Sequence, residues 1–181
     1  MTGAVGRAAA GLAILEAPVA PRGLGTGAFA ELTSAHLRPH PRVAEGMWLG
    51  CAGGVTAMMD LSDGLATDLP RLAAASGVGA RIDVARVPVD EATRAGAGAL
   101  GMDVLAWATG GGEDYELLLA CARGDFERLA HGLAALTGVR LTAIGEVTAT
   151  PGVRYVNAHG HPVEVAPGFE HFAARAGRER A

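Results

Sequence analysis

The sequence contains no lysine, so all 15 of its basic residues are arginines. The missing amine excludes Schiff-base chemistry, a lysine general base and the lysine of a phosphate-binding P-loop. Acidic residues number 19 and give a formal net charge of −4, which argues against a nucleic-acid backbone as partner. An acidic protein can still bind anionic substrates when Mg²⁺ bridges its carboxylates to a phosphate.

Cysteines, aromatic residues and long apolar runs are also scarce. Cys51 and Cys121 lack the close spacing of a zinc or redox motif, so both are expected to be reduced thiols of the core. No apolar run approaches the ~20 residues that cross a bilayer, and no convincing signal-peptide cleavage site is present. We therefore expect a cytoplasmic protein with no membrane partner.

Length and residue pattern predict one α+β domain spanning residues 1–181. Strands and helices alternate without a strict βαβ repeat, which favours a layered sandwich with a mixed sheet flanked by helices. Pro70 lies inside a predicted helix and is expected to bend or restart it. Helices are expected at residues 5–15, 29–37, 42–51, 62–76, 90–99 and 126–137, and strands at 55–61, 80–84, 115–122, 140–147, 153–157 and 162–165.

The first stretch with chemical content is Asp60-Leu-Ser-Asp-Gly-Leu-Ala-Thr-Asp-Leu69, where an apolar strand runs into an acidic turn and a helix. Asp60 and Ser62 share a face while the strand lasts, and Asp63 falls at the turn. Carboxylate and hydroxyl oxygens suit Mg²⁺, and the free amides of a helix start suit phosphate. Capping of the helix by Ser62 or Asp63 is the simpler interpretation, but it does not account for Asp60.

The second stretch is Gly110-Gly-Gly-Glu-Asp-Tyr-Glu-Leu-Leu118. Three consecutive glycines permit close approach of the backbone to a ligand, and two acids follow just before a buried strand. A loop that needs positive φ, with solvated acids, explains the same residues. By itself this stretch does not decide between the two.

Together the two stretches resemble the signature pair of the thiamine-monophosphate kinases. Shorter matches in the family's order extend over nearly the whole chain, among them Leu37-Arg-Pro39, Pro41-Arg-Val43, Gly79-Ala-Arg-Ile-Asp83, Ile144-Gly-Glu-Val147 and Gly168-Phe-Glu-His-Phe172. The resemblance implies transfer of the γ-phosphate of ATP to thiamine monophosphate, giving thiamine diphosphate. It also implies the fold of the carboxyl-terminal domain of aminoimidazole-ribonucleotide synthetase.

For the cofactor side of the site, the resemblance implies roles for four residues. Asp60 and Asp63 would be magnesium ligands, and Ser62 would contact a phosphate of ATP. Arg7 resembles a family position near the ATP phosphates. No residue is implied as a covalent catalyst, because phosphoryl transfer depends on positioning and charge neutralisation.

For the substrate side, the resemblance implies that Glu113 contacts thiamine monophosphate and that Phe169 packs against its rings. Asp68 and Asp114 are expected to support the site rather than to form it.

The family's amino-terminal domain, which dimerises and supplies most of the acidic magnesium ligands, is absent from this sequence. Two hypotheses follow. Either the chain works as an enzyme half, with an amino-terminal domain as partner in place of the homodimer of the full-length family, or it is a catalytically silent fragment or nucleotide- and phosphate-binding module of the same fold.

Overall fold

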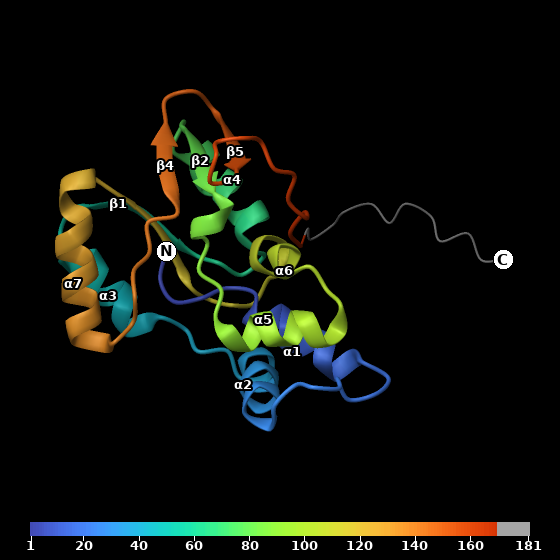
Figure 1. The fold of residues 1–181 in the computed structure, drawn as a ribbon. Coiled ribbons are helices and arrows are strands. Elements are labelled where there is room, and N and C mark those ends of the chain that lie inside the picture. Colours follow the sequence, from blue (N-terminus) through green and yellow to red (C-terminus); the bar gives the residue numbers. More distant parts are fainter. Residues whose placement is uncertain (170–181) are drawn as a thin grey trace.

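The computed structural model describes residues 1–169, in which helices and strands lie in three adjoining groups (Figure 1). The helices are α1 (Arg7–Glu16), α2 (Thr26–Leu37), α3 (Val43–Cys51), α4 (Leu65–Ala75), α5 (Glu91–Leu100), α6 (Val104–Gly110) and α7 (Phe126–Thr137), with the short 3-10 helices η1 (Val84–Arg86) and η2 (Arg123–Asp125). The strands are β1 (Val55–Asp60), β2 (Gly79–Asp83), β3 (Leu117–Cys121), β4 (Gly145–Thr148) and β5 (Gly152–Val156).

The strands form two small sheets. In the first, β1 runs antiparallel to β3, and Asp60 at the end of β1 lies opposite Leu117. The second has the order β4-β2-β5, in which β2 is antiparallel to β4 and parallel to β5. The sheet is therefore mixed, and the predicted α+β class with a mixed sheet and flanking helices is confirmed.

Three apolar clusters hold these elements together. Helix α4 presents Leu65, Leu69 and Ala73 at the spacing of one helix face, and its leucines join the central cluster with Leu118 of β3. A second cluster packs α1, α2, α5 and α6 around Leu32, and a third packs α3 and α7 against β1 and β3 around Leu129. Leu61, the residue after β1, is buried in the central cluster, which fixes the start of the turn that follows the strand.

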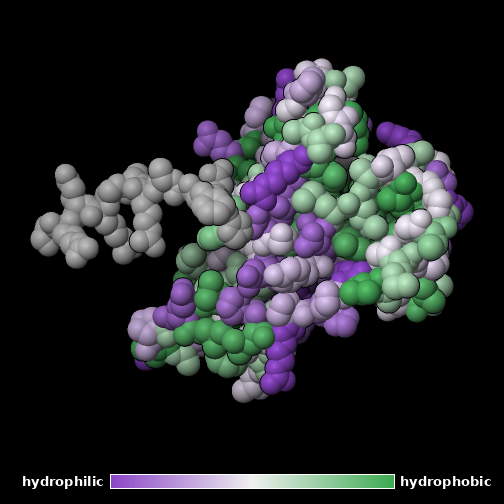
Figure 2. All heavy atoms as spheres, turned by 180° about the vertical axis from the view of Figure 1, so that it is seen from behind, coloured by the Kyte–Doolittle hydropathy of each residue, from purple (hydrophilic) through white to green (hydrophobic). Residues whose placement is uncertain are grey.

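Some large apolar side chains stay exposed, and several of them lie at the α1–α2 end of the molecule. Leu15 is 46% exposed and Val19 is 71% exposed. Figure 2 shows apolar residues gathered at this end, at the lower left of the back view. Within residues 1–169 no helix is both long and apolar enough to cross a bilayer.

The element predictions were wrong in three places. Helix α6 was not predicted; the Asp103 carboxylate caps it by accepting the Leu105 amide, and Trp107 is buried. The strand expected at 140–147 is only β4, because Leu141 forms an isolated bridge with Thr2 instead. The second arm of the expected hairpin, 162–165, is likewise reduced to one bridge at Pro162.

Two further corrections concern Pro70 and the cysteines. Of the two outcomes expected at Pro70, the restart is wrong: α4 continues through Pro70, because the helix is fixed by its buried apolar face. Cys51 is exposed at the end of α3 rather than in the core, and Cys121 is half-buried; both are free thiols.

Candidate functional site

The two motif stretches and residues 166–169 meet at the end of β1. The Glu113 amide donates to the Ser62 carbonyl (2.8 Å), and the Phe169 amide donates to the Asp63 carbonyl (3.0 Å). In Figure 1 the red end of the described chain reaches α6 and the start of α4, in agreement with these contacts. The structure therefore brings four predicted site residues, Ser62, Asp63, Glu113 and Phe169, into one region.

Close backbone packing explains the glycines of both motifs. A Cβ on Gly64 would lie 2.8 Å from the Gly111 carbonyl oxygen, and one on Gly112 would lie 2.5 Å from the Ser62 carbonyl oxygen. The glycines predicted to approach a ligand thus approach the protein's own backbone. The positive φ values of this loop fall on non-glycine residues, Glu113 (68°) and Tyr115 (51°), and not on the three glycines.

The acidic turn is organised by Asp68 and Arg71. Asp63 is 8% exposed, and its amide donates to the buried Asp68 carboxylate (2.9 Å). Burial raises the pKa of Asp68, and the neighbouring Asp63 carboxylate raises it further. Arg71 pairs with Asp63 and, at 3.2 Å, with Asp68. Asp68 thus supports the turn.

Neither Ser62 nor Asp63 caps α4. The N-cap position is Gly64, and it makes no side-chain capping bond. The capping interpretation of the sequence is therefore wrong. The error arises because the helix was expected to begin at Ser62. In the structure β1 ends at Asp60, and a turn of four residues separates it from α4, which begins at Leu65.

As a metal site the described residues are incomplete. Asp60 is exposed at the end of β1, while Asp63 is engaged by Arg71. Across residues 1–169 no three or more His, Cys, Asp or Glu side chains are grouped closely enough to hold a metal ion. Two carboxylates still suit a magnesium ion that takes its remaining oxygens from water and phosphates.

Arg7 lies apart from this turn. Its guanidinium pairs with Glu31 (2.5 Å) and Asp90 (2.9 Å). It lines a cavity of about 240 Å³ to which Asp114 and Arg42 also contribute, but none of residues 60–63 does. The predicted phosphate contact Arg7 therefore lines a cavity that Asp60, Ser62 and Asp63 do not line.

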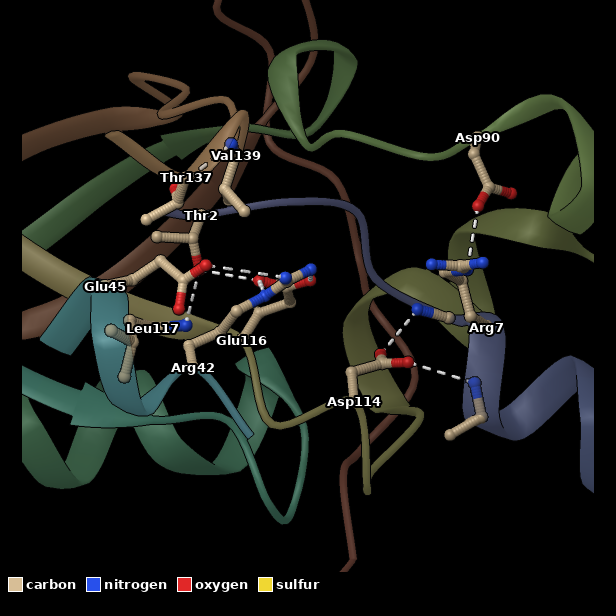
Figure 3. Close-up of polar contacts among 12 residues, drawn as sticks. Thr2, Arg7, Arg42, Glu45, Asp90, Asp114, Glu116, Leu117, Thr137 and Val139 are labelled. Atoms are coloured by element: carbon tan, nitrogen blue, oxygen red, sulfur yellow. Dashed lines mark hydrogen bonds and ion pairs between the residues drawn. The ribbon is translucent and has the colours of Figure 1, made fainter. Parts of the chain in front are cut away.

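Asp114 connects Arg7's helix to the motif loop. Its two carboxylate oxygens accept the amides of Gly6 (2.5 Å) and Ala8 (3.0 Å) at the start of α1 (Figure 3). Burial raises the pKa of Asp114 to about 6, and these amide bonds oppose the shift. Asp114 is therefore an anchor of the loop on the amino-terminal end of α1.

Asp114 is expected to titrate near pH 6 in the folded protein, above its ordinary value of 3.8. The folded state then holds the proton more tightly than the unfolded state. Its stabilising contribution is complete below about pH 4 and is lost as the pH rises through about 6. Carbon-detected NMR of the Asp114 carboxyl group checks the midpoint, and a midpoint near 4 would contradict the prediction.

Stability measurements provide a second check. The buried amino group of Met1, whose pKa is lowered to about 5, titrates in the opposite sense, since it stabilises as the pH rises. Urea unfolding of the wild type minus that of Asp114→Asn, taken across about pH 4 to 7, isolates the Asp114 contribution.

Sequence reasoning missed a buried network around Glu116. This carboxylate is 3% exposed and accepts two hydrogen bonds from Arg42, at 2.8 and 2.6 Å, and one from Thr2 at 2.6 Å (Figure 3). Thr2 in turn accepts the Leu117 amide, and Glu45 lies 3.8 Å from Arg42. The position of Glu116 directly before an apolar strand was the only signal of its burial in the sequence. Its partners Arg42 and Thr2 could not be identified in this way, because they are distant in the sequence.

A second, largely apolar cavity of about 310 Å³ borders the site. Its walls come from α1, α6 and the carboxyl-terminal segment, including Leu12, Trp107, Gly110, Gly111 and Pro167. The loop 110–116 therefore lies between an apolar hollow and the charged cavity beside Arg7.

The proteins similar to this chain include thiamine-monophosphate kinases. Thiamine-monophosphate kinase of Escherichia coli O157:H7 is 37% identical over 175 residues, which are 96% of this chain and 51% of that protein. The crystal structure of thiamine-monophosphate kinase from Stenotrophomonas maltophilia K279a aligns with a TM-score of 0.73 at 31% identity, over 90% of this chain and 49% of that one. AaThiL complexed with AMPPCP and TMP aligns with a TM-score of 0.75 at 28% identity, over 94% and 50%.

The chain spans about half the length of the curated relatives it matches. The resemblance to thiamine-monophosphate kinases and the expected fold are both confirmed. Residues 22–156 match the family described as AIR synthase related protein, C-terminal domain. The chain belongs to this family.

Proposed function

We propose that this chain forms the carboxyl-terminal-type half of a kinase that transfers the γ-phosphate of ATP to thiamine monophosphate. The observation that carries the proposal is the convergence of Ser62, Asp63, Glu113 and Phe169 at the end of β1. The 37% identity to a thiamine-monophosphate kinase supports it. A similar protein in complex with AMPPCP, an ATP analogue, and TMP supports both ligands.

On the substrate side, Glu113 and Phe169 contact thiamine monophosphate. Glu113 is exposed, and Phe169 is 59% exposed, so both side chains are accessible to a ligand. The backbone of each is fixed by a hydrogen bond to the turn after β1. An aromatic ring offers the apolar face that a heteroaromatic substrate needs.

On the cofactor side, Ser62 contacts an ATP phosphate, and Asp60 and Asp63 hold Mg²⁺ that is shared with the phosphates. Bound there, Mg²⁺ would neutralise phosphate charge. Arg71, which pairs with Asp63, must share or release that carboxylate when the metal binds. Arg7 is a weaker contact, since a phosphate must compete with Glu31 and Asp90 for its guanidinium.

The reaction needs little from the protein beyond this positioning. The acceptor is a phosphate that is already ionised at neutral pH, so no strong general base is required. The residues of the turn and the loop hold donor and acceptor in place and restrict their motion.

Turnover requires an amino-terminal-type half, on this polypeptide or on another. The donor set supports this requirement, because residues 1–169 supply no group of three acidic or other metal-binding side chains. The same observation favours the alternative, a silent module that binds nucleotide or phosphate without catalysis.

Titration calorimetry tests the proposal. The purified chain is titrated with a non-hydrolysable ATP analogue and with thiamine monophosphate, with and without Mg²⁺. Binding of the analogue is expected to depend on Mg²⁺ and to weaken at least about tenfold in Asp63→Asn, because the carboxylate charge that would face the metal is lost. Glu127→Gln, an exposed carboxylate on α7, is the matched control and should bind as the wild type does.

Absence of binding by a chain that is folded by circular dichroism would contradict the proposal for this chain alone. Kinase activity that appears only when a separate amino-terminal-type half is added would support it. Binding without activity in that mixture would favour the silent module.

A further inference from the structure

We propose that Asp114 and Glu116 are positioning residues that fix Glu113 for ligand contact. The proposal rests on the function proposed above, in which Glu113 touches thiamine monophosphate. Neither residue is expected to touch the ligand.

The loop needs such support because its backbone is strained. Glu113 has φ 68° and Tyr115 has φ 51°, in the left-handed region that residues with a side chain rarely adopt. Such conformations persist only when surrounding contacts over-determine them, and they gather at functional sites.

The strained residues are held on one side by β1 and the turn. The Glu113 amide donates to Ser62 (2.8 Å), and the Tyr115 amide donates to Leu61 (3.0 Å). The Leu61 amide donates in return to the Glu116 carbonyl (2.8 Å). These three bonds continue the pairing of β1 with β3 into the loop.

The alternate residues are held by their side chains. Figure 3 shows Asp114 directed to the start of α1, and Glu116 directed to Arg42 and Thr2. Both carboxylates use both of their oxygens: Asp114 accepts Gly6 and Ala8, and Glu116 accepts Arg42 twice. A carboxylate held through two oxygens cannot rotate freely, so it fixes the backbone that carries it.

These two anchors come from separate elements. Asp114 reaches α1, while Glu116 reaches Arg42 at the N-cap of α3. The loop is thereby held between two helices and β1, and the predicted substrate contact, Glu113, comes directly before the first anchor. Loosening either anchor should free Glu113 and Tyr115 while the second sheet stays intact.

The test is NMR-detected amide hydrogen exchange on the full chain. Arg42→Lys keeps the charge but replaces the two-point contact by a single one. Exchange at the Glu113 and Tyr115 amides is expected to accelerate at least tenfold, with the amides of β2 unchanged. Asp114→Asn loosens the other anchor and should give the same local acceleration.

The matched control is Arg81→Lys, which alters an Arg–Glu pair of similar length that is half-exposed on the second sheet (Arg81 to Glu146, 3.0 Å). It should leave the exchange at Glu113 and Tyr115 unchanged. Two results in Arg42→Lys or Asp114→Asn would overturn the proposal. One is an exchange rate that rises equally in β2 and in the loop, and the other is an exchange rate that does not rise in the loop.

Thiamine monophosphate binding separates this proposal from the function it rests on. If the wild type binds, the dissociation constant should rise in both anchor variants in parallel with the exchange rates, and an unchanged constant overturns the positioning role. If the wild-type chain does not bind, the proposed function fails for this chain, while the exchange data still decide whether the anchors fix the loop.

Discussion

Replacing Arg42 by Met is expected to lower the free energy of unfolding by about 3–5 kcal/mol, because it leaves a buried carboxylate without its cation. Glu116 is 3% exposed and receives two of its hydrogen bonds from Arg42. The bond from Thr2 remains, but a neutral hydroxyl does not balance a buried charge. Urea unfolding followed by circular dichroism measures the loss.

The double variant Arg42→Met, Glu116→Leu separates the effect of the unpaired charge from the effect of the lost side-chain packing. Replacement of buried ionic groups by apolar ones often costs little, so the double variant should recover part of the stability lost by the single one. The recovery stays partial because Glu45, which is also buried and lies 3.8 Å from Arg42, loses its cation in both variants. The half-exposed pair of Arg81 with Glu146 provides the control, and Arg81→Met should cost less than about 1 kcal/mol. Equal losses in Arg42→Met and Arg81→Met would contradict the assignment of a buried, stabilising pair.

Gly64→Ala is expected to lower the free energy of unfolding by more than about 2 kcal/mol and to weaken ligand binding with it. Gly64 has φ 99°, and an added Cβ would lie 2.8 Å from the Gly111 carbonyl oxygen. The atom it meets is backbone, which cannot rotate away. The turn carrying Ser62 and Asp63 must therefore separate from the loop that carries Glu113.

Gly98→Ala in α5 is the control for this substitution. Gly98 is an exposed helical residue, and an added Cβ would meet nothing within 4 Å. Alanine should stabilise the helix there by roughly 0.5–1 kcal/mol, since it loses less backbone freedom on folding. If Gly64→Ala has the same free energy of unfolding as the wild type, the prediction is contradicted, because the turn and the loop can then move apart without loss of stability.

Patterns that are local in the sequence predicted much of the fold. Helices were expected at the positions of α1, α5 and α7, and β1 and β3 were found as apolar runs. Helix α6 was missed because it is only seven residues long, shorter than the window in which helical periodicity becomes visible.

The site, too, was predicted only where its signals are local in the sequence. The two motifs and Phe169 were identified from the resemblance, and the structure places them together. The anchors Arg42 and Thr2 were not identified, because their partner Glu116 lies 74 and 114 residues away and an arginine beside prolines has no local signature of burial. The roles of Asp60, Ser62, Asp63, Arg7, Glu113 and Phe169 remain predictions.

The first residues of the chain have a consequence for the order of folding. The Met1 amino group donates to the Thr142 carbonyl, 141 residues away, and Thr2 donates to Glu116, 114 residues away. Closing loops of this length costs more chain entropy than local contacts do, so these contacts are expected to form after the helices. During synthesis the first residues must wait until most of the chain has left the ribosome. The hydrogen bond from Thr2 to Glu116, which supplements the two bonds from Arg42, is then among the last features of the native structure to form.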